Sequence, residues 1–337
     1  AGMDQFGGNN QMAPVLEAYK MGVAEHGEEF MRARFEQSAV RLLRNIFRVG
    51  LFENPYLDPA ETEKVVGNPE FMKAGYDAQV RSVVMLKNHA KTLSLKKQLK
   101  VYFPQKYLPG GKNWFGVETK ESWMDAIKPE LVNKYFQLVA KPEEADFALV
   151  CIDSPKGGVG YSEDDLKKNG NGYVPISLQY GPYKAEFARE TSIAGGSPFE
   201  TFTNRSYKGK SVTASNIQDM KMVNETKAKM GNKPVVVVVK ASNPMVFSEI
   251  EKSADAILVQ MGVQSQAILD IVSGVFEPSA LLPFQMPADM KTVEEQFEDV
   301  PRDMKCYVDA DGNTYDFAFG LNWSGVINDA RVSKYHK

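Results

Sequence analysis

The chain has 337 residues, of which 43% are apolar and 25% charged, as expected for one large globular domain or two smaller ones. A net charge of −3 gives no reason to expect a nucleic-acid partner or an anionic membrane surface, and no run of about 18 apolar residues predicts a membrane-spanning helix. With only Cys151 and Cys306, a disulfide framework is not expected, and the redox compartment stays open.

The N-terminal part of the chain predicts helices. Apolar residues recur at helical spacing in Met12–Ala24 and, more strongly, in Glu28–Val49, and Gly50 suits a helix C-terminus. Pro55 and Pro59 then end the helical pattern and predict a linker. The opening residues AGMDQFGGNN resemble neither a signal peptide nor an ordinary start, so we expect the chain to begin partway through a fold.

Beyond this linker, apolar strands alternate with helices. Strands are predicted at Lys100–Phe103, Phe147–Ile152, Pro234–Val239 and Ala256–Gln260, and helices at Asn68–Met85, Glu121–Ile127, Pro129–Leu138, Asn216–Met230, Pro244–Ile250 and Gln266–Ser273. The run PVVVVV is apolar on both faces, as in a central parallel strand. The alternation predicts one α/β domain whose largely parallel sheet is covered by helices on both faces, with a long polar insertion at 181–212.

Several short motifs lack residues that their function would require. Gly209-Lys210-Ser211 lacks the glycine that a phosphate loop needs five positions earlier, where Asn204 stands. The run from 309 to 313 lacks the glycine and glutamate of a calcium loop, and its Asp311-Gly312 pair predicts a hairpin turn instead. The three histidines are scattered, so no metal site is predicted. The sequence contains no GxSxG motif, so it does not indicate a nucleophilic hydrolase.

A glycine-rich acidic loop follows the strand Phe147–Ile152 and carries Glu163, Asp164 and Asp165. Open α/β sheets place their chemistry at the carboxyl ends of strands, so this loop is a candidate site. Two interpretations stay open: a solvated turn, or a mobile carboxylic acid delivered to a neighbouring site as a general acid. Glycoside hydrolysis needs two carboxyl groups, about 5 Å apart in retaining enzymes, and the residues themselves indicate no second one.

Several segments, in the same order, resemble those of family 3 glycoside hydrolases, the β-glucosidase and β-xylosidase group. They are Ala1–Asp4 for AGxD, residues 36–56 for AVRRILRxKFxxGLFENPY, 81–88 for RxSxVLLKN, 93–95 for LPL, 233–239 for GKPVVVVL, 254–260 for ADAILxAW, 274–287 for GDxNPSGRLPxTxP and 315–321 for YPFGFGLSY. Departures at 262–266, where the family has GQEGG, and at 280–281 leave the substrate preference open.

The resemblance implies a (β/α)8 barrel followed by an α/β sandwich. Residues 1–50 would be the end of the barrel, 51–61 a linker and 62–337 the sandwich that carries the acid/base loop. The family's nucleophilic Asp would lie on a barrel segment absent from this chain. In the counterpart of the family's YxExxGxxxxLxLP loop, Glu163 is the candidate general acid/base, with Asp164 or Asp165 as fallbacks because extra residues disturb the alignment.

The resemblance also implies two substrate-binding residues. Trp114 would stack on the sugar in the leaving-group subsite, against the alternative of a core or loop-anchoring Trp. Asp4 would line the barrel end of the site, against the alternative of a turn-forming Asp.

The implied function is that of a retaining exo-acting β-glycosidase, foremost a β-glucosidase. It needs no cofactor and no metal, and the chain alone is expected to be inactive, with a barrel-containing polypeptide as its partner and a periplasmic or secreted location. Association with further copies of the chain stays open. The alternatives are a non-catalytic carbohydrate-binding or scaffolding module, a β-xylosidase, and a β-N-acetylglucosaminidase branch in which Glu163 would be idle.

Overall fold

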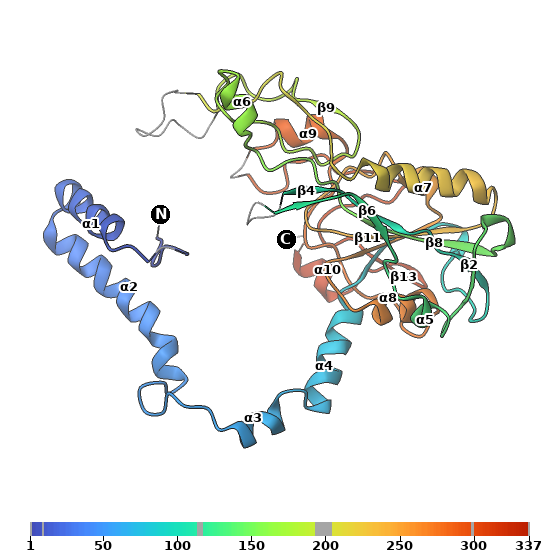
Figure 1. Cartoon of the computed structure of the whole chain (residues 1–337), viewed down its shortest axis with the longest axis horizontal. Coiled ribbons are helices and arrows are strands. Elements are labelled where there is room, and N and C mark those ends of the chain that lie inside the picture. The colour runs from blue at the N-terminus through green and yellow to red at the C-terminus, as the bar shows by residue number, and fades with distance from the viewer. Residues whose placement is uncertain (1, 9, 113–116, 193–203, 298–299, 336–337) are drawn as a thin grey trace. The chain divides into compact units, whose positions relative to one another are not determined.

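The computed structural model describes residues 2–8, 10–112, 117–192, 204–297 and 300–335, and divides into two compact units, Ala1–Met72 and Lys73–Lys337 (Figure 1). The first unit is helical: α1 (Ala13–His26), α2 (Glu28–Arg48) and α3 (Pro59–Val65) lie within it, and α4 (Pro69–Val80) begins in it. The helices predicted at 12–24 and 28–49 are thus confirmed. No helix among the described residues has the length and apolar character needed to cross a membrane.

The second unit is built on an eight-stranded sheet. In spatial order its strands are β14 (Gly325–Val326), β13 (Leu321–Asn322), β1 (Val84–Asn88), β12 (Ala256–Gln260), β11 (Val235–Lys240), β8 (Phe147–Asp153), β2 (Lys100–Tyr102) and β7 (Gln137–Val139). The strands from β12 to β7 are parallel to their neighbours, whereas β1, β13 and β14 form an antiparallel edge. The mostly parallel sheet predicted from the sequence is confirmed.

Helices cover both faces of this sheet, and Figure 1 shows α7 (Ile217–Met230) and α8 (Ser265–Val272) on opposite sides of it. Alternate valines of β11 enter two different cores, because successive side chains of a strand point to opposite faces. Val237 packs in the core that includes Met222 and Val223 of α7, whereas Val236 and Val238 pack in the core that includes α8. Both faces of the central strand β11 are therefore buried away from solvent.

Shorter elements surround the sheet. The hairpin-like pairs are β3 (Lys106–Leu108) with β6 (Ser122–Met124), β4 (Gly111–Lys112) with β5 (Glu118–Thr119), and β9 (Tyr183–Lys184) with β10 (Ser211–Val212). The remaining helices are α5 (Pro129–Val132), α6 (Glu163–Lys167), α9 (Met290–Glu295), α10 (Ala330–Tyr335) and the single 3₁₀ turns His89–Lys91, Pro142–Glu144 and Glu251–Ser253.

Four predicted helices need correction. The stretch 121–127 contains strand β6 and no helix, the helix predicted at 129–138 ends at Val132 before strand β7, and 244–250 is not helical. The helix predicted at 68–85 ends at Val80, and β1 begins at Val84. Short apolar runs fit either period, so pairing with distant strands decides them. The predicted turn at Asp311-Gly312 is confirmed by the bridge that joins Val308 to Thr314 around it.

Candidate functional site

The acidic loop, residues 154–180, leaves the carboxyl end of β8 and returns to it. Its two ends are tied together by Tyr180, whose buried hydroxyl donates to the Asp153 carbonyl oxygen at 2.5 Å. At the start of the loop, the Asn216 side chain accepts from the Lys156 N–H at 2.7 Å and donates to the Ser154 carbonyl oxygen at 3.1 Å. These hydrogen bonds hold the two ends of the loop close together at the carboxyl end of β8.

Two glycines allow the two arms of this loop to approach each other closely. Residues 157 and 177 form one antiparallel bridge, and residues 161 and 173 form a second. A β-carbon on Gly157 would lie 2.1 Å from the Ser177 carbonyl oxygen, and Gly172, at φ +80°, would place one 2.6 Å from the Tyr161 ring. Any larger residue at either position would push the arms apart.

Helix α6 forms the tip of the acidic loop and is capped by Ser162, whose hydroxyl accepts from the Asp165 N–H at 3.3 Å. The Asp165 carboxylate accepts from Lys210 Nζ at 2.6 Å and from the Gly172 N–H at 2.9 Å. The hydrogen bond from Lys210 lowers the pKa of Asp165, which is therefore a fixed, ionised anchor of the tip. Lys210 belongs to Gly209-Lys210-Ser211, the segment that lacks a glycine required for a phosphate loop.

Glu163 and Asp164 behave differently from Asp165. Their side chains are 81% and 82% exposed, and Lys167 approaches them only to 4.0 Å and 3.7 Å. Neither carboxylate accepts a hydrogen bond from any described residue. The loop thus presents two exposed carboxyl groups, each with only a loose ion pair to Lys167, on an anchored tip, whereas Asp165 has a structural role.

A hollow of about 620 Å³ lies beside the acidic loop, and Glu163 is not among its lining residues. Tyr161 and Tyr173 line one part of it. Elsewhere in the lining, the buried Glu294 accepts from the hydroxyls of Tyr183 at 2.6 Å and Tyr207 at 2.9 Å. The Glu294 carboxylate is thus occupied by structural hydrogen bonds.

A buried polar cluster supports the end of β8. Asp219 of α7 is inaccessible to solvent, and its Oδ2 accepts from the Asn216 side chain at 2.8 Å and from the Asp153 N–H at 3.2 Å. No donor among the described residues reaches its Oδ1, and burial raises the pKa of Asp219 to about 6. Burial also opposes ionisation of Asp153, but hydrogen bonds from Lys106 and Lys156 bring the pKa of Asp153 below its usual value.

Asp4 lies in the first compact unit and is bound by α2. Its carboxylate accepts from Ser38 Oγ at 2.9 Å and from Arg34 Nη1 at 2.8 Å, and Arg41 Nη1 lies 3.2 Å from Oδ2. The hydrogen bond from Ser38, with those from the two arginines, lowers the pKa of Asp4. Asp4 also lines a mostly apolar hollow of about 570 Å³ with Phe6 and other residues of this unit.

Trp114 lies outside the described residues, which stop at Lys112 and resume at Val117. Glu163 and Asp4 belong to different compact units. Within the described part of the chain, no group of three or more His, Cys, Asp or Glu side chains is arranged to hold a metal ion. Sequence reasoning missed Asn216 and Lys210, because their partners lie 62 and 45 residues away and no local motif marks them.

Comparison with known proteins identifies the family of this chain. The model of the glycosyl hydrolase family 3 C-terminal domain matches residues 83–323, most of the chain. The chain belongs to glycosyl hydrolase family 3. A relative described as a probable β-glucosidase C of Aspergillus flavus is 29% identical over 325 residues, which are 96% of this chain and 40% of that protein.

Other family 3 proteins agree with this result. A periplasmic β-glucosidase/β-xylosidase of Dickeya chrysanthemi is 25% identical over 304 residues, 90% of this chain and 36% of that protein. The crystal structure of a β-glucosidase from Listeria innocua superposes with a TM-score of 0.51 at 16% identity, over 93% of this chain and 41% of that one, which supports the fold alone. The chain therefore spans about two fifths of these family 3 proteins.

Proposed function

We propose that this chain is the C-terminal portion of a retaining, exo-acting β-glucosidase that hydrolyses β-linked glucosides and oligosaccharides. Family membership and the names of the relatives support this proposal. Residues 1–50 would end the catalytic barrel, 51–61 would be the linker and 62–337 the α/β sandwich. Because the chain spans only 40% of the Aspergillus relative, we assign the nucleophilic Asp to a barrel segment outside it.

Glu163 is the proposed general acid/base: the resemblance of this loop to the family's acid/base loop favours it, and the contrast with Asp165 argues against the third carboxylate of the helix. Asp165 accepts two structural hydrogen bonds, whereas Glu163 of the same anchored helix accepts none from the described residues and lies 4.0 Å from Lys167 at the surface. A general acid must be protonated when the substrate binds. Packing of another protein surface against a carboxyl group removes it from water, which favours its protonated form. Glu163 would protonate the departing glycosidic oxygen and then deprotonate the water that releases the sugar.

The exposed apolar faces of α1 and α2 support a barrel-containing partner segment. Phe30, Leu43 and Phe47 of α2 are 56%, 41% and 59% exposed, far more than a helix covering its own core would leave open. We propose that the preceding barrel segment, in the same polypeptide or a separate one, covers these side chains. A periplasmic or secreted location is proposed by analogy with the Dickeya relative.

A β-xylosidase is the second candidate function, because the name of the Dickeya relative includes both activities. Trp114 would stack on the leaving-group sugar in either case. Hydrolysis rates with matched aryl β-glucoside and β-xyloside substrates separate the two candidates.

The decisive experiment joins the chain to a barrel-containing family 3 segment and measures turnover. Relative to the wild type, Glu163→Gln is expected to lose about 10²–10⁴-fold in kcat on an unactivated β-linked disaccharide. The loss is expected to be smaller on an aryl β-glucoside, whose leaving group needs less protonation. Azide should restore turnover of the aryl substrate by Glu163→Ala. Asp164→Asn is the matched control, because Asp164 is equally exposed on the same helix.

Three outcomes would overturn parts of this proposal. Full disaccharide activity in Glu163→Gln would remove the acid/base assignment. This is the result expected for the N-acetylglucosaminidase branch, in which Glu163 would be idle. A large loss in Asp164→Asn alone would transfer the role to Asp164. No turnover by the joined wild-type protein with any β-glycoside would favour a non-catalytic carbohydrate-binding module.

A further inference from the structure

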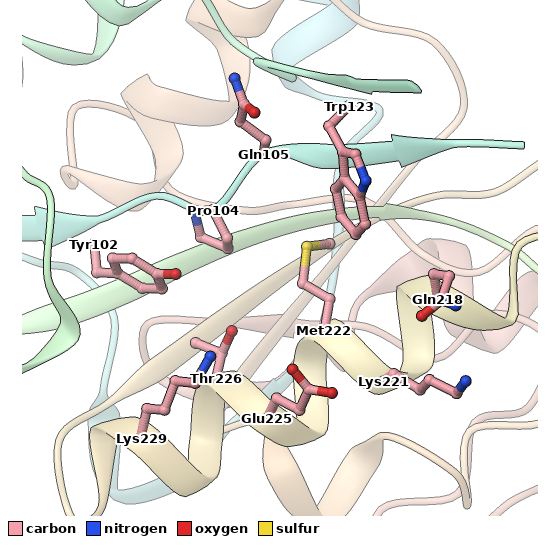
Figure 2. A pocket seen from close by; sticks show the side chains of 10 residues that line it. All are labelled: Tyr102, Pro104, Gln105, Trp123, Gln218, Lys221, Met222, Glu225, Thr226 and Lys229. Atoms are coloured by element: carbon pink, nitrogen blue, oxygen red, sulfur yellow. The ribbon is translucent and has the colours of Figure 1, made fainter. Parts of the chain in front are cut away.

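A groove of about 340 Å³ runs between helix α7 and the β3–β6 hairpin. Trp123 of β6 forms one wall, and the floor includes Met222 of α7. Figure 2 shows the Trp123 ring facing Met222, with Lys221 and Glu225 projecting from α7 at the rim. We call this feature the α7 groove, and it contains none of the residues assigned above to hydrolysis.

Trp123 is held in place and yet exposed to solvent. The β3–β6 register pairs it with Tyr107, and the two ring centroids are 5.2 Å apart at an interplanar angle of 58°. Tyr107 is itself buried, and its hydroxyl donates to Glu121 at 2.9 Å. Trp123 nevertheless remains 52% exposed. A fixed aromatic ring with an open face binds a flat apolar surface without paying much conformational entropy.

The rim of the groove supplies unengaged polar groups. Lys221, Glu225 and Lys229 follow each other at four-residue spacing on α7, so they line one helix face. Their side chains form no hydrogen bond or ion pair with any residue that the structure describes. Gln105, on the opposite side, donates to Asp125 at 3.1 Å and keeps its carbonyl oxygen free to accept from a ligand.

The charge pattern of the rim points to a neutral ligand. A positive, a negative and a positive side chain alternate along α7, so neither a polyanion nor a polycation would be attracted along the whole groove. Hydroxyl groups, by contrast, both donate and accept, and match ammonium, carboxylate and amide groups together. The volume lies near the lower end of the range of about 300–1,000 Å³ for small-molecule sites, which suits a short oligomer.

We propose that the α7 groove is a second carbohydrate-binding site, which holds a short stretch of neutral β-linked glucan with one sugar ring stacked on Trp123. The C–H face of a β-linked glucose ring would lie on the indole, and its hydroxyls would reach Glu225 and the flanking lysines. The class of sugar rests on the function proposed above, whereas the existence of the site rests on the groove.

Binding of cellotetraose and laminaritetraose to the full chain tests this proposal, by calorimetry and by tryptophan fluorescence. Saturable binding of at least one tetrasaccharide is expected. Trp123→Ala should weaken it about tenfold or more, a loss of about 1.4 kcal/mol, and Trp123→Phe should restore part of the affinity. Met124→Ala is the matched control, because the next residue of a strand points to the opposite face. Circular dichroism shows whether each variant keeps its fold.

A further variant separates this site from the hydrolytic one. Glu163→Gln should leave tetrasaccharide binding unchanged, because Glu163 is not among the residues that line the groove. Absence of saturable binding, or equal binding by the wild type and Trp123→Ala, would overturn the proposal and leave the hydrolytic assignment standing. Binding of polygalacturonate in preference to both neutral tetrasaccharides would overturn it as well. Loss of hydrolysis in the joined Glu163→Gln protein with intact groove binding would support both assignments separately.

Discussion

Helices α1 and α7 have the same length, 14 residues, and opposite surroundings. Helix α1 buries none of its residues, whereas α7 buries Asp219, Met222, Val223, Thr226 and Met230 against the sheet. In proteins most helical stability comes from packing of one face rather than from intrinsic propensity. The difference therefore teaches that the second unit carries its own core, while the first unit leaves apolar side chains of its helices exposed.

The largest test of this comparison is a matched pair of leucine substitutions. Leu149 of β8 is fully buried, so Leu149→Ala should lower the free energy of unfolding by about 2–5 kcal/mol. Leu43 of α2 is 41% exposed, and Leu43→Ala should change it by no more than about 0.5 kcal/mol. Denaturant unfolding followed by circular dichroism measures both. A comparable loss for Leu43→Ala would show that the first unit already has a core of its own.

A second test uses the buried charge that α7 carries and α1 lacks. The pKa of Asp219 is raised from 3.8 to about 6, so below about pH 4 it is protonated in both the folded and the unfolded chain. As the pH rises toward 6, the unfolded chain releases this proton first. The free energy of unfolding should therefore fall by up to about 3 kcal/mol and level off above about pH 7. Asp219→Asn should remove this fall.

Urea unfolding at about pH 4.5 and pH 7.5 measures the effect. Asp153 contacts the same cluster, and because its pKa is lowered, its contribution to stability changes with pH in the opposite direction, so only the difference between the wild type and Asp219→Asn is diagnostic. Asp164→Asn, at an exposed position, is the control and should follow the wild type. The same pH dependence in the wild type and Asp219→Asn would contradict the assignment.

The smallest expected effect separates two carboxylates on one turn of α6. Asp165→Asn breaks the charged contact with Lys210 and should destabilise the acidic loop by about 1–3 kcal/mol, whereas Glu163→Gln should change it by no more than about 0.5 kcal/mol. Hydrogen exchange of the loop amides, including the Val174 N–H bonded to the Gly160 carbonyl, is the measurement. Faster exchange in Glu163→Gln than in Asp165→Asn would reverse the two roles.

The sequence by itself determined the four central parallel strands β12, β11, β8 and β2, and it indicated the family. The run at 234–239 could only be a strand covered on both faces, because it is apolar at every position and β-branched, and it is the buried core of β11. The long helices of the first unit followed from their periodicity. Motifs in a constant order indicated family 3, and Glu163 was singled out as the acid/base candidate, an assignment that stays a prediction.

Only the tertiary structure decided which acidic side chains are engaged and which are open. Glu163, Asp164 and Asp165 are adjacent, and nothing in the local sequence distinguishes them. Lys210, 45 residues away, donates to Asp165, whereas Glu163 and Asp164 remain exposed. The stretch around Trp123 likewise fitted a helix until its pairing with Tyr107 made it a strand. In both cases the deciding contact is non-local, and local periodicity and propensity carry no information about a partner that the chain brings in from elsewhere.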